Sequence, residues 1–112
     1  MMIYKIFTTE QWHQLEAEGT TLGAPIDLAD GFIHFSTADQ VAETASKHFA
    51  EQDALILAAV DPAPLGEALK WEESRGGALF PHLYGALKLE DVTKHWPLAL
   101  SGGRHLFPDG LL

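Results

Sequence analysis

One stretch of this sequence decides both the predicted fold and the candidate site: Gly31-Phe32-Ile33-His34-Phe35-Ser36-Thr37. It reads as a short strand, and the side chains of a strand alternate between its two faces. Ile33 and Phe35 then share an apolar face that suits a core. The other face carries Phe32, His34 and Ser36, which combine an aromatic ring with two hydrogen-bonding groups. Such a face suits the wall of a cleft.

A second segment later in the chain repeats this arrangement: Phe80-Pro81-His82-Leu83-Tyr84-Gly85. If the segment is extended, Phe80, His82 and Tyr84 point to one side. Two such walls facing each other would enclose a pocket with imidazole, hydroxyl and phenol groups, and histidine can accept or donate a proton there. The alternative is that each histidine bonds to a nearby backbone carbonyl while the aromatic rings fill the core or its rim.

Trp71 and Glu72 form a third candidate pair. A buried carboxylate beside a large aromatic ring is suited to acid or base chemistry. The alternative is a core tryptophan followed by a solvated glutamate. We expect Ser36 to hydrogen-bond a ligand and Tyr84 or Trp71 to stack on its ring. The predicted catalytic residues are His34, His82 and Glu72, and the predicted ligand-binding residues are Phe32, Ser36, Thr37, Trp71 and Tyr84.

Composition narrows the class of protein. Of the 112 residues, 46% are hydrophobic and 21% charged, so we expect one ordinary globular domain over residues 1–112. Cysteine is absent, which excludes a disulfide framework, a thiolate zinc site and a cysteine nucleophile. The formal net charge is −9, so no nucleic-acid partner is expected. Neither an apolar run of ~20 residues nor a signal peptide is visible, which predicts a cytoplasmic protein without membrane contact.

The first predicted elements are a strand over residues 3–7 and a helix behind it. Thr8 and Gln11 have the spacing of a capping box, the arrangement in which each side chain bonds the other residue's backbone N–H at a helix start. Gly19 is a typical residue just past a helix end.

The next segments alternate in the same way. Residues 20–30 read as a loop with glycine and proline, and residues 32–35 as a strand. Thr37 and Gln40 repeat the capping spacing. They precede a second helix, predicted over residues 38–49 from its apolar periodicity.

The second half of the chain is rich in strands. Residues 54–60 are apolar on both faces, which predicts the central strand of a sheet. The Gly- and Pro-rich tail, residues 99–112, is expected to be loosely ordered. Helices near the start and strands later predict an α+β fold with a curved, mainly antiparallel sheet and two helices. Further extended segments are predicted over residues 69–72, 84–89 and 93–98.

Several catalytic motifs are absent. The histidines lack the H-E-x-x-H spacing of zinc enzymes, so no metal site is predicted, and neither a G-x-S-x-G elbow nor a glycine-rich nucleotide fingerprint occurs. His34-Phe35-Ser36 matches half of the two-histidine phosphoesterase signature, which needs two H-x-[S/T] copies. His82 is followed by Leu83-Tyr84 and does not complete the second copy.

Taken together, the two histidine segments, Gln40, Phe49 and Trp71-Glu72 closely resemble a small bacterial family, domain-of-unknown-function family 952. The resemblance runs from Ile3 to about Leu98. Some members carry a glutathione S-transferase-related description, which these residues do not support.

That family is distantly similar to the ADP-ribosyltransferase fold, which binds NAD in a cleft between two small antiparallel sheets. The resemblance implies that Ser36 supports the nicotinamide or its ribose and that His82 lies on a later pocket strand. This sequence departs from the transferases at two places. Tyr4-Lys5 stands where they commonly carry Arg or His, and His82 is the nearest match to their catalytic glutamate.

The predicted function is therefore a small cytosolic protein that binds a nucleotide-like or phosphorylated small molecule, with NAD as the candidate substrate of an ADP-ribosyltransferase-like enzyme. Nicotinamide would leave through an oxocarbenium-like state, stabilised by groups aimed at the developing charge. His34 would orient or protonate the ligand. The alternatives are a non-catalytic metabolite-binding or protein-interaction module, and a purely structural role for both histidines.

Overall fold

The fold is built around a three-stranded antiparallel sheet in the order β1-β4-β8. In this computed structural model, which describes residues 1–108 and 111, the strands are β1 (Ile3–Thr8), β4 (Leu55–Val60) and β8 (Val92–Leu98). The apolar run predicts a central strand, and the position of β4 confirms it. A strand covered on both faces needs apolar side chains on both.

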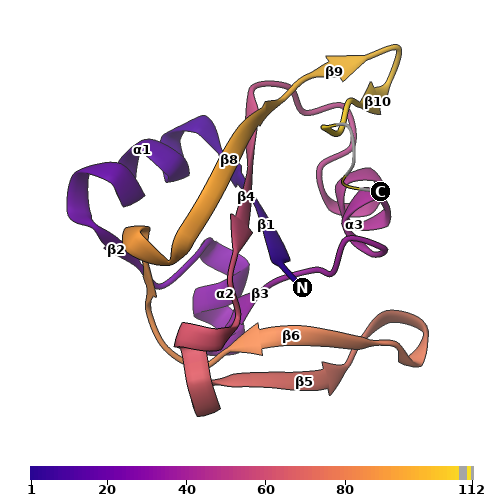
Figure 1. The fold of residues 1–112 in the computed structure, drawn as a ribbon. Helices are drawn as coiled ribbons and strands as arrows, with labels where there is room; N and C mark the ends of the chain where they lie inside the picture. The colour runs from indigo at the N-terminus through magenta and orange to yellow at the C-terminus, as the bar shows by residue number, and fades with distance from the viewer. Residues whose placement is uncertain (109–110, 112) are drawn as a thin grey trace.

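A helix covers each face of this sheet, as Figure 1 shows with α1 and α3 on opposite sides of the strands. α1 (Thr9–Glu18) contributes Trp12 to one buried apolar cluster. α3 (Val41–His48) contributes Val41 to a second cluster. Because side chains alternate along each strand, β1 and β4 supply residues to both clusters.

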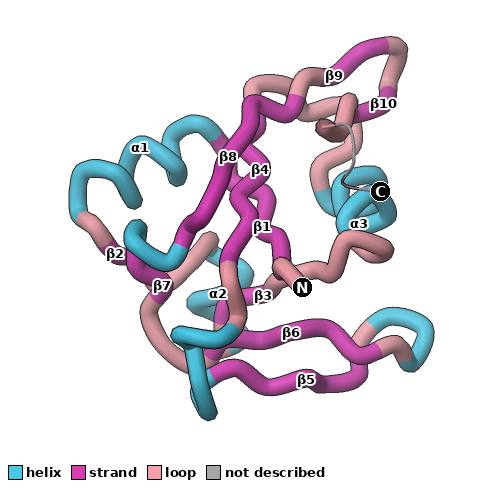
Figure 2. The backbone as a smooth tube through the Cα atoms, viewed as in Figure 1, coloured by secondary structure: helices cyan, strands magenta, loops and turns pink. Residues whose placement is uncertain are grey.

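A second three-stranded antiparallel sheet has the order β3-β6-β5 and lies below the first in the view of Figure 2. Its strands are β3 (Ile33–His34), β6 (Leu79–Leu83) and β5 (Leu69–Glu73). β3 is shorter than predicted, because the chain then turns to β1. Ser36 and Tyr4 exchange two backbone hydrogen bonds of 2.7 and 2.8 Å, which tie the two sheets together.

The predicted start and end of α1 are confirmed. The Thr8 hydroxyl accepts the Gln11 N–H at 3.1 Å, and the Gln11 side chain accepts the Thr8 N–H at 3.0 Å. Gly19 follows the helix with a φ of 78°, a left-handed conformation that glycine adopts without a steric penalty. The other described elements are short: β2 (Thr20–Thr21), β7 (Leu87–Lys88), β9 (Leu100–Ser101), β10 (Arg104–His105) and the 3₁₀ turns Ala63–Ala68, Arg75–Gly77 and Leu89–Asp91.

The predicted loop over residues 20–30 is wrong in part, because it contains the short helix α2 (Pro25–Asp30). Pro25 occupies the first helical turn and Gly31 follows the helix with a φ of 85°. Proline at the start and glycine past the end is a typical helix signal. The apolar periodicity missed α2, since Asp27 is its only buried residue. The prediction of two helices is therefore incomplete, because it leaves out α2.

The second predicted helix begins later than expected, at Val41 rather than at residue 38. Here the Gln40 side chain accepts the Thr37 N–H at 3.0 Å and donates to the carbonyl of Leu79 at 2.8 Å. The capping spacing thus forms a turn ahead of the helix and attaches it to β6.

The predicted strand over residues 84–89 is also wrong in part, because only residues 87–88 within it form a strand. β6 ends at Leu83, and the Tyr84 N–H donates to the carbonyl of Ala68 at 2.8 Å. Strand structure resumes only in β7, which pairs with β2.

The α+β class with mainly antiparallel sheets is confirmed. Within the predicted loose tail, β9 and β10 pair as a hairpin, while residues 109, 110 and 112 lie outside the described residues. Among the described helices, none is long and apolar enough to cross a membrane.

Candidate functional site

His34 and His82 lie directly opposite each other on β3 and β6. Their ring centroids are 5.3 Å apart, with an interplanar angle of 68°. Opposed residues of antiparallel strands project from the same face of the sheet. The prediction that the two histidine segments adjoin is confirmed.

Both ring nitrogens of His34 contact carboxylates. Nδ1 lies 2.6 Å from Oδ1 of Asp27, and Nε2 lies 3.0 Å from Oδ2 of Asp30. An ionised carboxylate can only accept hydrogen bonds, so a ring nitrogen that carries a proton can donate to the carboxylate it faces. His34 is therefore fully engaged by α2.

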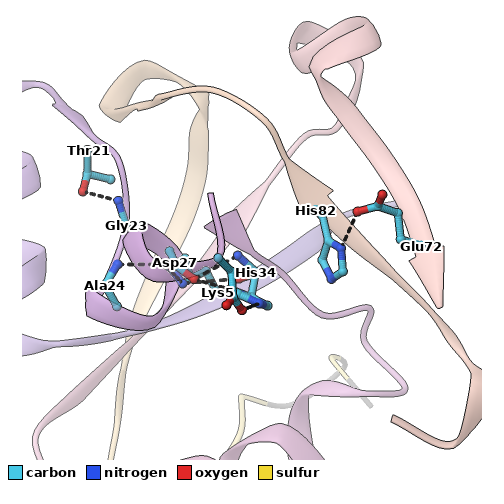
Figure 3. Close-up of polar contacts among 9 residues, drawn as sticks. Lys5, Thr21, Gly23, Ala24, Asp27, His34, Glu72 and His82 are labelled. Atoms are coloured by element: carbon cyan, nitrogen blue, oxygen red, sulfur yellow. Dashed lines mark hydrogen bonds and ion pairs between the residues drawn. The ribbon is translucent and has the colours of Figure 1, made fainter. Parts of the chain in front are cut away.

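Asp27 is the centre of this network, and Figure 3 shows it surrounded by its partners. Its side chain has no solvent exposure, and Oδ2 lies 2.9 Å from the ammonium of Lys5, which is itself 7% exposed. The backbone N–H groups of Ala24 and His34 donate to it at 2.7 and 3.1 Å. A buried charge needs such a complete set of partners to offset its lost hydration.

The partners also decide the protonation state of Asp27. Burial acts to raise its pKa, but the hydrogen bond from His34 and the charge of Lys5 outweigh it, and the net pKa falls to about 2. Burial lowers the pKa of Lys5, and Asp27 opposes that shift. Asp27 is thus ionised at neutral pH, and Lys5 is the buried cation that balances it.

His82 has a carboxylate partner of its own. Its Nδ1 lies 2.8 Å from Oε1 of Glu72 on β5 (Figure 3). The Tyr84 hydroxyl donates to the same oxygen at 2.8 Å. The hydrogen bonds from His82 and Tyr84 lower the pKa of Glu72, and the bond to Glu72 raises the pKa of Tyr84. Glu72 is therefore an ionised acceptor held by two donors.

The ring of Phe32 connects these two histidine groups. It stacks on His82 with a centroid distance of 4.2 Å and lies 4.6 Å from the His34 ring. The Tyr84 ring is 5.1 Å away. Phe32 thus limits how far either imidazole can rotate.

A cavity of about 660 Å³ lies beside the histidine pair. β1, α2, α3 and the second sheet all contribute to its wall. Aliphatic and aromatic side chains make up much of the lining, including Tyr4, Ile6, Phe35, Phe49 and Phe80. The polar lining residues include Lys5, Asp27, Asp30, His34, Ser36 and His82.

One comparison with known proteins identifies the family. The family described as "Protein of unknown function (DUF952)" matches residues 6–95. This chain belongs to that family. The resemblance predicted from the histidine motifs is therefore confirmed. The comparison with curated proteins finds no match.

Solved structures of CC0527 from Caulobacter crescentus are similar to this DUF952 chain. One crystal structure is 48% identical, covers 99% of this chain and 98% of that chain, and has a TM-score of 0.95. A double mutant of CC0527 gives 47% identity, the same coverage and a TM-score of 0.94. The solution NMR structure is 49% identical over 93% of this chain and 90% of that chain, with a TM-score of 0.83.

Most of the predicted site residues of this DUF952 chain come together. His34, Ser36 and His82 line the cavity, and the Ser36 hydroxyl lies 2.9 Å from that of Thr44 on α3. Glu72 adjoins the cavity through its bond to His82. Tyr84 and Phe32 stand beside the histidines without lining the cavity. The roles of these residues in ligand binding or catalysis stay predictions.

Two predicted residues lie elsewhere. Trp71 stands opposite Pro81, so it projects from the face of the strand pair that His82 does not use, and it is 39% exposed. Stacking of Trp71 on a ligand in this cavity does not fit that position. The Thr37 N–H is bonded to Gln40, and Thr37 is not among the lining residues.

Sequence reasoning missed Lys5, Asp27 and Asp30. One signal was present for Lys5, because alternation places it on the same face as the core residues Ile3 and Phe7. A lysine at a core-facing position indicates a buried partner of opposite charge. Among the described residues, no group of three or more His, Asp or Glu side chains is arranged to hold a metal ion.

Proposed function

We propose that this chain binds a nucleotide-like small molecule, with NAD as the first candidate, in the cavity bounded by its two three-stranded sheets. The observation that carries the proposal is a pair of buried polar side chains, Lys5 and His82, in the wall of a cavity with many apolar lining residues. Small-molecule sites are typically hollows of ~300–1,000 Å³ with mostly apolar walls and a few polar groups. The volume of about 660 Å³ lies within that range.

Lys5 supports a ligand with a phosphate or carbonyl oxygen. An ammonium group has three N–H donors. Within the described part of the chain, its polar partners are Asp27 at 2.9 Å and the carbonyl of His34 at 3.3 Å. The third donor is available to a ligand oxygen in the cavity.

The rest of the lining supports a ligand with a flat ring. Tyr4, Phe35 and Phe80 offer aromatic surface, which favours offset or edge contacts with a heterocycle. The Ser36 and Thr44 hydroxyls lie on the same wall and can exchange hydrogen bonds with a ribose or an amide.

The catalytic form of this proposal is an ADP-ribosyltransferase-like cleavage of NAD. The bond between the ribose carbon and the nicotinamide nitrogen breaks, and its electron pair stays with the nicotinamide. Positive charge develops on the ribose, whose carbon then forms a bond to the oxygen of water or of an acceptor hydroxyl, which loses its proton. Carboxylates around the histidine pair, Asp30 and Glu72 among them, favour that charge. The non-catalytic alternative is a module that binds the same ligand without turnover.

Filling the cavity is expected to block binding. Thr44 lines the cavity from α3, so Thr44→Leu adds apolar bulk there. Isothermal titration calorimetry with NAD and with ADP-ribose should show affinity for the wild type and at least about tenfold weaker affinity for Thr44→Leu, a loss of ~1.4 kcal/mol. Ser46→Leu is the matched control, because Ser46 is exposed on the same helix. Its affinity should equal that of the wild type.

Release of nicotinamide separates the two forms of the proposal. Binding with release supports the enzyme, and binding without release supports the non-catalytic module. Absence of binding by both NAD and ADP-ribose, or equal binding by Thr44→Leu and wild type, contradicts the proposed site.

A further inference from the structure

The two histidines differ in how their ring nitrogens are used. Both nitrogens of His34 face carboxylates, at 2.6 and 3.0 Å. His82 uses only Nδ1, which contacts Glu72 at 2.8 Å, and its Nε2 has no hydrogen-bond partner among the described residues. The His82 side chain is 6% exposed and lines the cavity. Every buried polar side-chain atom of the described residues has a partner, so an unpartnered Nε2 is accessible to solvent.

The partner of His82 decides which of its nitrogens carries the proton. A carboxylate has no hydrogen to donate, so Nδ1 supplies the N–H of the contact with Glu72. In a neutral imidazole with Nδ1 protonated, Nε2 holds a lone pair. Tyr84 fixes Glu72 from a second direction, and Phe32 stacks on the ring. The lone pair is thus held in one orientation.

We propose that Nε2 of His82 is the proton acceptor of the cavity, that Glu72 is its positioning residue, and that His34 is a clamp for α2 and takes no part in proton transfer. This inference rests on the proposed function, because it assigns chemistry to the same cavity. It also revises the predicted role of His34, since each of its ring nitrogens faces a carboxylate oxygen on α2, at 2.6 and 3.0 Å.

In the reaction, His82 activates a water molecule or a hydroxyl of an acceptor. Nε2 takes the proton, the oxygen forms a bond to the electrophilic carbon or phosphorus of the ligand, and the leaving group departs with the electron pair of the broken bond. His82 then carries the proton and one positive charge, which Glu72 stabilises at 2.8 Å before the proton passes to solvent. Water or an acceptor hydroxyl is the only co-reactant required.

The decisive experiment reads the tautomer directly. Long-range ¹H–¹⁵N NMR of the full chain at neutral pH should show His82 protonated at Nδ1 with an unprotonated Nε2. Glu72→Ala should convert His82 to the Nε2–H form, and Glu72→Gln, which keeps an acceptor oxygen, should restore the Nδ1–H form. Glu73→Ala is the matched control. The carboxylate of Glu73 projects from the face of β5 opposite to that of Glu72, so its removal should not change the His82 tautomer.

A wild-type His82 protonated at Nε2, or a tautomer that Glu72→Ala leaves unchanged, overturns the inference whether or not NAD binds. If NAD fails to bind but the tautomers behave as expected, the proposed ligand is wrong and the assignment of His82 stands. If nicotinamide is released, His82→Gln should lower kcat by about 10²–10⁴-fold and Glu72→Ala by about 10–100-fold, with little change in KM. Unchanged kcat in His82→Gln also overturns the inference.

Discussion

Asp27→Asn is expected to lower the free energy of unfolding by about 3–5 kcal/mol, the usual cost of leaving one partner of a buried ion pair alone. The substitution removes the charge that balances Lys5, whose side chain is 7% exposed. It also replaces one acceptor oxygen by an amide group that faces donors, since His34 and Ala24 both donate to this carboxylate. Urea denaturation of wild type and variant measures the difference.

Two further variants isolate the cause. Asp30→Asn alters a carboxylate on the same helix, but this side chain is 43% exposed, so a change within about 0.5 kcal/mol is expected. Adding Lys5→Met to Asp27→Asn removes the unpaired buried charge and should recover at least about 1 kcal/mol. A loss of unfolding free energy below about 1 kcal/mol for Asp27→Asn, or no recovery in the double variant, contradicts the claim that the Lys5–Asp27 pair stabilises the fold.

The contribution of Asp27 to the free energy of unfolding depends on pH. The pKa of Asp27 is about 2 in the folded chain against an ordinary 3.8, so its ionisation stabilises the fold above about pH 4 and this stabilisation is lost as the pH falls through about 2. The shift corresponds to about 2 kcal/mol. Denaturation curves recorded between about pH 5 and pH 2 should show this loss in the wild type and not in Asp27→Asn.

Gly23→Ala is expected to destabilise the fold by about 2–4 kcal/mol through strain and a clash. Gly23 has a φ of 103°, and a Cβ there would lie 2.3 Å from Oδ2 and 2.6 Å from Cβ of Asp27. Asp27 cannot retreat without leaving Lys5 and His34. Denaturation measurements give the loss in stability.

Gly31→Ala separates the clash from the strain. Gly31 also has a positive φ, 85°, but a Cβ at this position would meet no described atom within 4 Å beyond its neighbours in the chain. The substitution should cost about 1 kcal/mol, the strain of a non-glycine residue in this region alone. Equal losses for the two variants would show that the contact with Asp27 is not what requires glycine at position 23.

Local patterns predicted the framework of this fold well. The capping spacing of Thr8 and Gln11, the two-sided apolar run in β4 and the alternation around His34 are all short-range signals. The adjacency of His34 and His82 followed from a chemical argument, since both segments carry polar groups on one strand face. Their pairing on β3 and β6 confirms it.

The predictions that failed concern segments that are positioned by residues distant in the sequence. α2 buries no apolar residue, and it is held by Asp27, whose partner Lys5 lies on the first strand. No sequence pattern near Asp27 predicts its contact with Lys5. The position of Trp71 depends on the register between β5 and β6, which reverses the face of every side chain if it shifts by one residue.

The most direct test of the proposed cavity is a ¹H–¹⁵N NMR titration of the labelled full chain with NAD. We expect saturable shift changes concentrated at Lys5, His34, Ser36 and His82, with the β9–β10 hairpin unaffected. Absence of shifts at saturating NAD, or shifts confined to residues outside the cavity wall, would contradict the proposed site.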